Sequence, residues 1–200
     1  MKSLNIGVLA FHGDVDEHIN ALRNAAKNLR LNVDVILVRT KEALHQLDAL
    51  ILPGGESTTL QKLCEREEMF EEMKKIKNIF GTCAGAILLS KTIYHKMAGQ
   101  KTLQLMNITI DRNAYGKQKD SFEQEIKTDL GKINAVFIRA PKIKSIGKQV
   151  KVLAKHKTEV LCCEQKVGSH YYLATAFHPE LTSTIFHEYF LKQVILTPGI

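Results

Sequence analysis

The sequence predicts a three-layer α/β/α fold with a mostly parallel central sheet and antiparallel additions in the C-terminal half. Three observations support this prediction. Apolar runs of strand length alternate with helical segments over the first half, shorter alternating segments follow from about residue 102, and a last helix is expected at 182–195. The 200 residues, 44% of them hydrophobic, suffice for one well-buried core. We therefore expect a single domain over residues 1–200.

The first half alternates strand and helix. Each expected strand is an apolar run, and each expected helix has apolar residues at helical spacing. The expected order is strand 4–11, helix 14–30, strand 32–39, strand 48–55, helix 57–76 and strand 78–83. Asp14 with Glu17 predicts a capping box, and Ser57 or its neighbour caps the second helix. Strands separated by helices pair in parallel with right-handed crossovers.

The second half has a different texture. Short segments with close turns, such as the one at His156-Lys157, predict antiparallel hairpins. The formal net charge of +7 raises the question of nucleic acid, but the densest basic run, 142–157, alternates Lys with Val, Ile and Leu. That alternation is typical of strands with one solvated face. We therefore expect no nucleic-acid partner, while an acidic protein partner stays open.

Targeting and redox signals are weak. The chain contains no run of about 18 uncharged apolar residues, and its start reaches charge too soon for a signal peptide. We expect no membrane association and a cytoplasmic location. The four cysteines form no C-x-x-C pair, so we expect reduced thiols and no metal site.

One cysteine has the setting of a nucleophile. Cys83 lies between Gly81 and Gly85, where the strand 78–83 turns directly into a helix. A nucleophile on such an elbow needs small neighbours, and the helix N-terminus stabilises a thiolate and supplies amide donors, among them the N–H of Ala84. The alternative is that Cys83 is a small buried residue at a strand end.

A base for this nucleophile is found in TAFHPEL. His178 follows an apolar strand, and Glu180 lies on the same side of an extended chain, where its carboxylate can orient the imidazole. Cys83, His178 and Glu180 therefore form a catalytic triad in outline. The other seven histidines have no orienting carboxylate at this spacing, and we interpret them as solvated or as satisfied core residues.

Several motifs together resemble a known family. GTCAG (81–85), PGGESTT (53–59) and HPEL (178–181) resemble the triad-type, class I glutamine amidotransferases, which are flavodoxin-like in fold. GVLAFHGDVDEH (7–18), RNAYGKQKDSFE (112–123) and FIRAP (137–141) narrow the resemblance to the glutaminase subunits of pyridoxal 5′-phosphate synthases. Phe11-His12 departs from the Leu-Gln pair that is more frequent there, which puts partner contacts in doubt and leaves the triad unaffected.

The resemblance implies an activity, a partner and a pocket. It implies hydrolysis of L-glutamine through a cysteine thioester, with the ammonia supplied to the synthase subunit for vitamin B6 biosynthesis, and no cofactor in this chain. Gly55 and Ala84 would form the oxyanion hole. The implied substrate-binding residues are Gly55, Glu56, Ser57, Arg112, Ile138 and Arg139. The residues alone favour surface charges for both arginines, and only the resemblance reverses that interpretation; PGGESTT is equally well a turn followed by a helix start.

Three alternatives remain open at this stage. The chain could serve another acceptor, such as the glutaminase of imidazole glycerol phosphate synthase does. It could be a non-catalytic regulatory protein that keeps the elbow, although an intact Cys83, His178 and Glu180 argue against this. It could also sense oxidants through Cys83, which predicts peroxide sensitivity without glutamine dependence.

Overall fold

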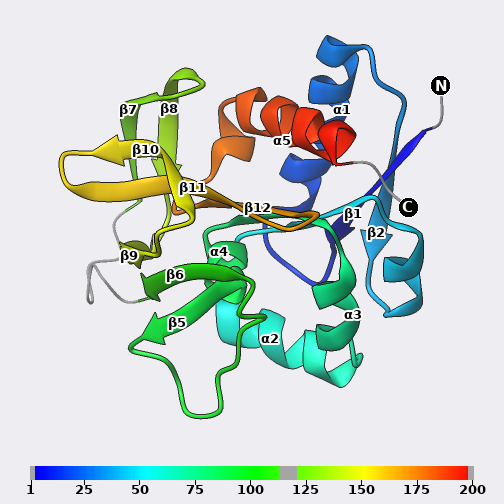
Figure 1. Ribbon diagram of the computed structural model, residues 1–200, viewed down its shortest axis with the longest axis horizontal. Helices are drawn as coiled ribbons and strands as arrows, with labels where there is room; N and C mark the ends of the chain where they lie inside the picture. The colour runs from blue at the N-terminus through cyan, green and yellow to red at the C-terminus, as the bar shows by residue number, and fades with distance from the viewer. Residues whose placement is uncertain (1–2, 113–120, 198–200) are drawn as a thin grey trace.

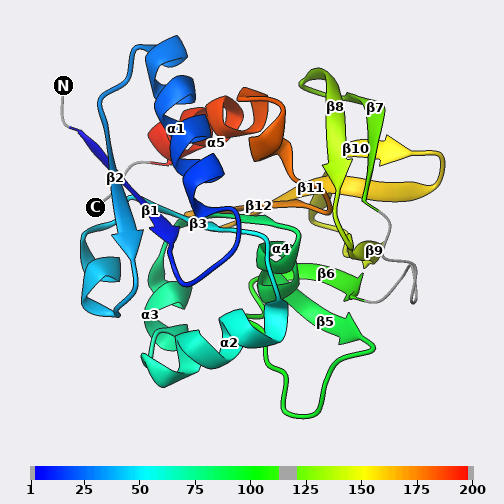
Figure 2. The same ribbon diagram turned by 180° about the vertical axis from the view of Figure 1, so that it is seen from behind.

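The computed structural model describes residues 3–112 and 121–197, so residues 113–120 of the motif RNAYGKQKDSFE lie outside the described part of the chain. A central sheet has helices on both faces (Figure 1). α1 and α5 cover one face, and α2, α3 and α4 lie against the other, an arrangement that the opposite view repeats (Figure 2). The helical elements are α1 (Val15–Leu29), η1 (Glu42–Gln46), α2 (Ser57–Arg66), α3 (Phe70–Lys75), α4 (Ala84–Leu89), η2 (Pro179–Leu181) and α5 (Ile185–Leu196).

The sheet follows the order β2-β1-β3-β4-β12-β11-β10-β7-β8. Its first five strands pair in parallel, and the rest of this path is antiparallel. The strands are β1 (Leu4–Leu9), β2 (Val33–Val38), β3 (Ala49–Leu52), β4 (Asn78–Thr82), β5 (Ser90–Tyr94), β6 (Met106–Asp111), β7 (Phe122–Thr128), β8 (Gly131–Phe137), β9 (Lys142–Ile146), β10 (Val150–His156), β11 (Glu159–Val167) and β12 (His170–Thr175). The predicted fold class is confirmed.

The C-terminal half supplies the antiparallel strands, with two qualifications. The expected hairpin at His156-Lys157 joins β10 to β11, and Lys157 has a positive φ of 52° there. The central strand β12 nevertheless pairs in parallel with β4. The strand β5 was not expected; it pairs in parallel with β6, which is joined to the main sheet through β9.

Two apolar clusters, one on each face, hold the layers together. The first contains buried side chains of α2, α3 and α4, and the second contains those of α1 and α5. In the second cluster, the α1 residues Leu22 and Ala25 and the α5 residues Phe190 and Leu191 are completely buried. Because such side chains lie mostly on one stripe of α1, burial against the sheet explains why the amphipathic pattern of 14–30 folds as a helix.

The expected helix 57–76 is two helices. The chain turns at Glu68, which has a φ of 51°, and the N–H of Met69 donates to the carbonyl oxygen of Cys64 at 2.8 Å. This is the bonding of a Schellman cap, in which the residue after the left-handed position packs inward; Met69 is completely buried. The prediction was wrong here because the helical periodicity continues through a break that the burial of one methionine stabilises.

All four cysteines are free and buried. Burial raises the pKa of Cys64 to about 12 and that of Cys163 to about 12, and it also raises the pKa of Cys162. The expectation that these three are core residues is confirmed, and their reduced state stays a prediction. Across residues 3–112 and 121–197, no helix is long and apolar enough to cross a membrane.

Candidate active site

Cys83 lies on a strained elbow between β4 and α4. Its φ of 48° and ψ of −104° are unusual for a residue with a side chain, and such a conformation costs about 1–3 kcal/mol. The turn is crowded: a Cβ on Gly81 would lie 2.6 Å from the backbone of Gly85, and one on Gly85 would overlap the carbonyl oxygen of Leu52. The two glycines are therefore required for the elbow to pack against β3.

His178 reaches the same end of the sheet from the neighbouring strand. β12 pairs in parallel with β4 so that Thr175 is opposite Thr82, and the N–H of Cys83 donates to the carbonyl oxygen of Thr175 at 2.9 Å. His178 follows three residues after Thr175 and is 3% exposed. The carboxyl ends of two adjacent parallel strands thus bring the thiol and the imidazole together.

Two carboxylates hold one nitrogen of this imidazole. His178 Nδ1 lies 2.8 Å from Glu180 Oε1 and 3.0 Å from Asp14 Oδ2. With its proton on Nδ1, the ring donates to both oxygens. His178 Nε2 is buried and makes no hydrogen bond within residues 3–112 and 121–197, which leaves it available for proton exchange with a neighbouring group.

The charges of these groups are coupled. Burial opposes a charge on His178, but its interactions with Asp14, Cys83 and Glu180 outweigh burial and raise the pKa of the imidazole above its ordinary value. The hydrogen bond with His178 lowers the pKa of Asp14, whereas burial raises the pKa of Glu180. An imidazolium held this way can stabilise a thiolate beside it.

Asp14 was not predicted to be part of the site. It does precede α1, as expected, but its side chain makes no capping hydrogen bond and the capping-box prediction is wrong. The bond to the His178 imidazole takes the carboxylate away from the helix N-terminus. Its position just after Gly13 on the turn that follows β1 is the signal that could have indicated it, because this turn reaches the same edge of the sheet.

A second group of polar residues forms around the start of α2. Glu56 is the N-cap: its two carboxylate oxygens accept from the N–H of Thr58 at 3.1 Å and of Thr59 at 2.7 Å. Burial opposes the charge, but the hydrogen bonds from the two threonines lower the pKa of Glu56 to about 2. The prediction that Ser57 or its neighbour caps this helix is confirmed, with Glu56 as the cap.

Arg112, which directly follows β6, completes this group. Its guanidinium lies 3.1 Å from Glu56 Oε1 and donates to Gln100 Oε1 at 3.3 Å, and the Gln100 amide donates to Ser57 Oγ at 3.1 Å. Gln100 is 6% exposed and was missed from the sequence, where an isolated glutamine carries no signal. The bonds preorganise Arg112 and Ser57 relative to each other.

Both groups line one cavity of about 320 Å³. Of the predicted site residues, only Glu180 does not line it, because it lies behind His178. The lining residues are Gly13, Asp14, Gly55, Glu56, Ser57, Cys83, Ala84, Ile87, Arg112, Ile138, Arg139 and His178. Residues from the ends of several strands and the start of two helices therefore meet around the thiol of Cys83.

A metal is not needed to explain the cluster of Asp14, His178 and Glu180. Their ligand atoms lie within 4.8 Å of one another, which is compatible with a cation site. However, a single N–H on His178 Nδ1 satisfies both carboxylates. The absence of a metal stays a prediction from the sequence.

The comparisons with known proteins agree with this geometry. A model of the SNO glutamine amidotransferase family matches residues 8–196. The chain belongs to this family. It is 42% identical over 200 residues to the pyridoxal 5′-phosphate synthase subunit PdxT of Thermococcus onnurineus, covering 96% of this chain and 100% of that one.

Further relatives support the assignment. The subunit of the same name from Oenococcus oeni is 44% identical over 196 residues, covering 95% of this chain and 96% of that one. A crystal structure described as a glutamine amidotransferase superposes with a TM-score of 0.81 at 40% identity, covering 94% of this amidotransferase and 98% of that chain. The resemblance that the sequence motifs indicated is therefore confirmed.

Proposed function

We propose that this chain hydrolyses L-glutamine to L-glutamate and ammonia and supplies the ammonia to a synthase subunit that makes pyridoxal 5′-phosphate. The observation that carries the proposal is the cavity in which Cys83, on a strained elbow, meets an imidazole oriented by Glu180. The names of the relatives from Thermococcus onnurineus and Oenococcus oeni support the choice of acceptor. Within this proposal the chain acts as one amidotransferase domain over residues 1–200.

The reaction has two halves. The Cys83 thiolate attacks the side-chain carboxamide carbon of glutamine, and His178 gives a proton to the departing nitrogen, so that ammonia leaves and a γ-glutamyl thioester remains. A water molecule then attacks the thioester while His178 accepts its proton, and the thiol is released with glutamate. Glu180 holds His178 in the tautomer that presents Nε2 to these transfers.

Two backbone amides are suited to stabilise the oxyanion. Gly55 and Ala84 both line the cavity, and neither N–H donates to another residue in the described part of the chain. Donors that are already in place where negative charge develops cost no reorganisation, and removing one from a comparable site lowers the rate by about 10²–10³.

The charged groups of the cavity are suited to the two ends of the substrate. Arg139 is exposed and makes no ion pair with the other described residues, so its guanidinium can bind the α-carboxylate in a bidentate manner. Arg112 is already bound to Glu56. Glu56, which stays ionised at neutral pH because its pKa is about 2, can accept from the α-ammonium. Ser57 and the backbone of Ile138 complete the pocket.

The partner is expected to enclose the product. Ammonia that reached bulk water would be protonated and lost, so its transfer requires a closed path into the synthase subunit. Docking of that subunit would cover the cavity mouth, and we expect turnover of glutamine to rise when it docks.

Glutamate release tests the proposal. We expect turnover to appear or increase when a pyridoxal 5′-phosphate synthase subunit is added, and Cys83→Ala to abolish it at unchanged free energy of unfolding, because alanine fits the crowded elbow. Turnover that survives in Cys83→Ala would remove the triad. Activation only by another acceptor, tested with an imidazole glycerol phosphate synthase subunit, would keep the chemistry and change the partner.

A further inference from the structure

Two histidines lie behind the triad, buried between helices from opposite ends of the chain. His18 comes from α1 and His187 from α5, and both are 0% exposed. His18 Nδ1 lies 2.9 Å from His187 Nε2. On its other side, His18 Nε2 lies 3.0 Å from Thr82 Oγ1 and 3.5 Å from Glu180 Oε1.

The location of Thr82 and Glu180 makes this contact informative. Thr82 directly precedes Cys83, and Glu180 binds His178, so one ring nitrogen of His18 lies against the residue beside the nucleophile and the residue that orients the base. His18 therefore contacts the neighbour of Cys83 and the partner of His178, and it does not itself line the cavity.

The environment selects one tautomer for each ring. If His18 carried its proton on Nδ1, its Nε2 lone pair would face the Glu180 carboxylate, and His187 would have an N–H on Nδ1. His187 Nδ1 is buried and has no hydrogen-bond partner within the described residues. An orphan N–H there costs more than an orphan lone pair, and a lone pair facing a carboxylate is repelled. Both problems disappear when each ring is protonated on Nε2.

With those tautomers, His187 donates to His18, and His18 in turn donates toward the triad. His187 Nε2–H donates to His18 Nδ1, and His18 Nε2–H donates to Thr82 Oγ1 and lies beside Glu180 Oε1, which is 3.5 Å from the nitrogen. Burial lowers the pKa of His18 and lowers that of His187 to about 3, so both rings are neutral near pH 7. A neutral N–H attracts the Glu180 carboxylate without neutralising it, so the negative charge remains available to stabilise a protonated His178.

We propose that His18 and His187 are positioning residues that hold Glu180, and through it His178, in the catalytic geometry. The inference rests on the proposed glutaminase function for its kinetic consequence, but the arrangement of protons follows from the contacts alone. Glu180 Oε2 makes no hydrogen bond within the described residues, so the orientation of this carboxylate depends on what binds Oε1. There the His178 N–H donates at 2.8 Å, and the His18 N–H, with its nitrogen 3.5 Å away, places a second polar hydrogen beside the same carboxylate oxygen.

The kinetic test uses the complete glutaminase with its synthase partner. His18→Leu and His187→Leu should lower kcat for glutamine by about 10- to 100-fold, the scale of lost outer-shell hydrogen bonds in metal sites, with KM changed less than about twofold. His187→Gln keeps a donor at the position of Nε2 and should restore most of kcat. Phe190→Leu, a change to another completely buried residue of α5, is the control for lost stability and should leave kcat unchanged.

Nitrogen-15 NMR of the unmodified protein tests the proton arrangement independently of activity. We expect both rings to be neutral and protonated on Nε2 at pH 7. A proton on His18 Nδ1, or leucine variants that lose activity only as Phe190→Leu does, would overturn the proposal. If the wild-type protein did not hydrolyse glutamine, the proposed function would fail, while the tautomers would still decide whether the donors point to Glu180.

Discussion

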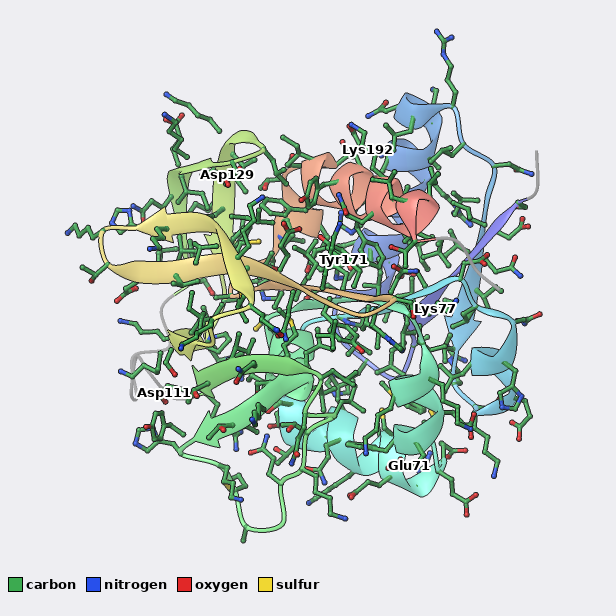
Figure 3. All side chains as sticks on the ribbon, in the orientation of Figure 1. Glu71, Lys77, Asp111, Asp129, Tyr171 and Lys192 are labelled. Carbon is green, nitrogen blue, oxygen red and sulfur yellow. The ribbon has the colours of Figure 1, made fainter. Side chains whose placement is uncertain are left out.

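Two buried glutamates on this protein show how the same residue type can have different roles. Glu180 is 8% exposed and accepts from His178, two residues earlier, whereas Glu164 is 6% exposed and accepts from side chains further along the chain. Glu164 Oε2 accepts from the hydroxyls of Tyr171 and Tyr189, each at 2.8 Å, and Lys151 Nζ lies 3.3 Å from Glu164 Oε1. Figure 3 labels Tyr171 between β12 and α5, and this residue is not among those that line the cavity.

The two glutamates differ in whether their partner side chains can gain or lose a proton near neutral pH. Glu180 lies beside two histidines, His178 and His18, of which His178 lines the cavity. Around Glu164, burial raises the pKa of Tyr171 and of Tyr189, so that both stay protonated donors over the physiological range. A buried carboxylate with partners that cannot change charge stabilises the fold, whereas one with imidazole partners can take part in proton transfer.

Among the substitutions that compare these two glutamates, Glu180→Gln should have the largest effect on the reaction. The amide cannot favour the Nδ1–H tautomer of His178, and an equivalent change in a Ser-His-Asp triad lowers kcat about 10⁴-fold. Because Asp14 also binds His178 Nδ1, we expect a smaller loss here, of about 10³-fold. Steady-state glutamate release with the synthase present measures the loss of kcat. Combining Asp14→Asn with Glu180→Gln should increase this loss to about 10⁴-fold. A variant with normal kcat would contradict the role of Glu180.

Glu164→Gln should affect stability and spare turnover. Two tyrosine hydroxyls lose their charged acceptor, which should lower the free energy of unfolding by about 1–3 kcal/mol. Urea unfolding at pH 7.5 gives the change, and kcat should stay within about twofold of wild type. If Glu164→Gln lowered kcat as much as Glu180→Gln, the distinction between the two networks would be lost.

The dependence of the free energy of unfolding on pH should also separate the two networks. The unfolded chain protonates His187 below its ordinary pKa of 6.5, but burial keeps the folded ring neutral down to a pKa of about 3. The free energy of unfolding should therefore fall by about 1.4 kcal/mol per pH unit for this group as the pH drops below 6.5. His18 acts in the same direction.

Urea unfolding at pH 7, 6 and 5 measures this slope. His187→Gln removes one titrating group and should flatten it, while Glu164→Gln should not. His178 acts with the opposite sign and at higher pH: its pKa is raised, so its stabilising contribution is complete below 6.5 and is lost as the pH rises. Equal slopes in wild type and His187→Gln would show that the buried ring is charged.

The local chemistry of the site was predictable from short segments. The pattern around Cys83 demanded small neighbours, and both glycines are in contact with backbone in the folded elbow. The hydrogen bond between His178 and Glu180, two residues apart, was predicted correctly, but the extended chain expected there was wrong, because Glu180 lies in the 3-10 helix η2 that begins just after His178. The motifs also predicted the pocket residues Arg112 and Arg139, which line the same cavity as Cys83.

What was missed depends on segments far apart in the chain. Asp14 belonged to a good capping pattern, yet its carboxylate binds a histidine 164 positions later in the sequence. His18 and His187 are separated by 169 positions and looked like ordinary helix residues. The break at Glu68 was hidden because helical periodicity continues across it, while the decision was made by the burial of Met69.

The sequence alone determined the elements whose causes are local: the alternation of strand and helix, the glycines around the elbow and the short His-x-Glu spacing. These depend on backbone geometry and on which face of an element is apolar. Only the tertiary structure decided which polar groups share protons. The charge and tautomer of Asp14, His18 and His187 are set by burial and by atoms a few ångströms away on other elements, and no local pattern specifies those distances.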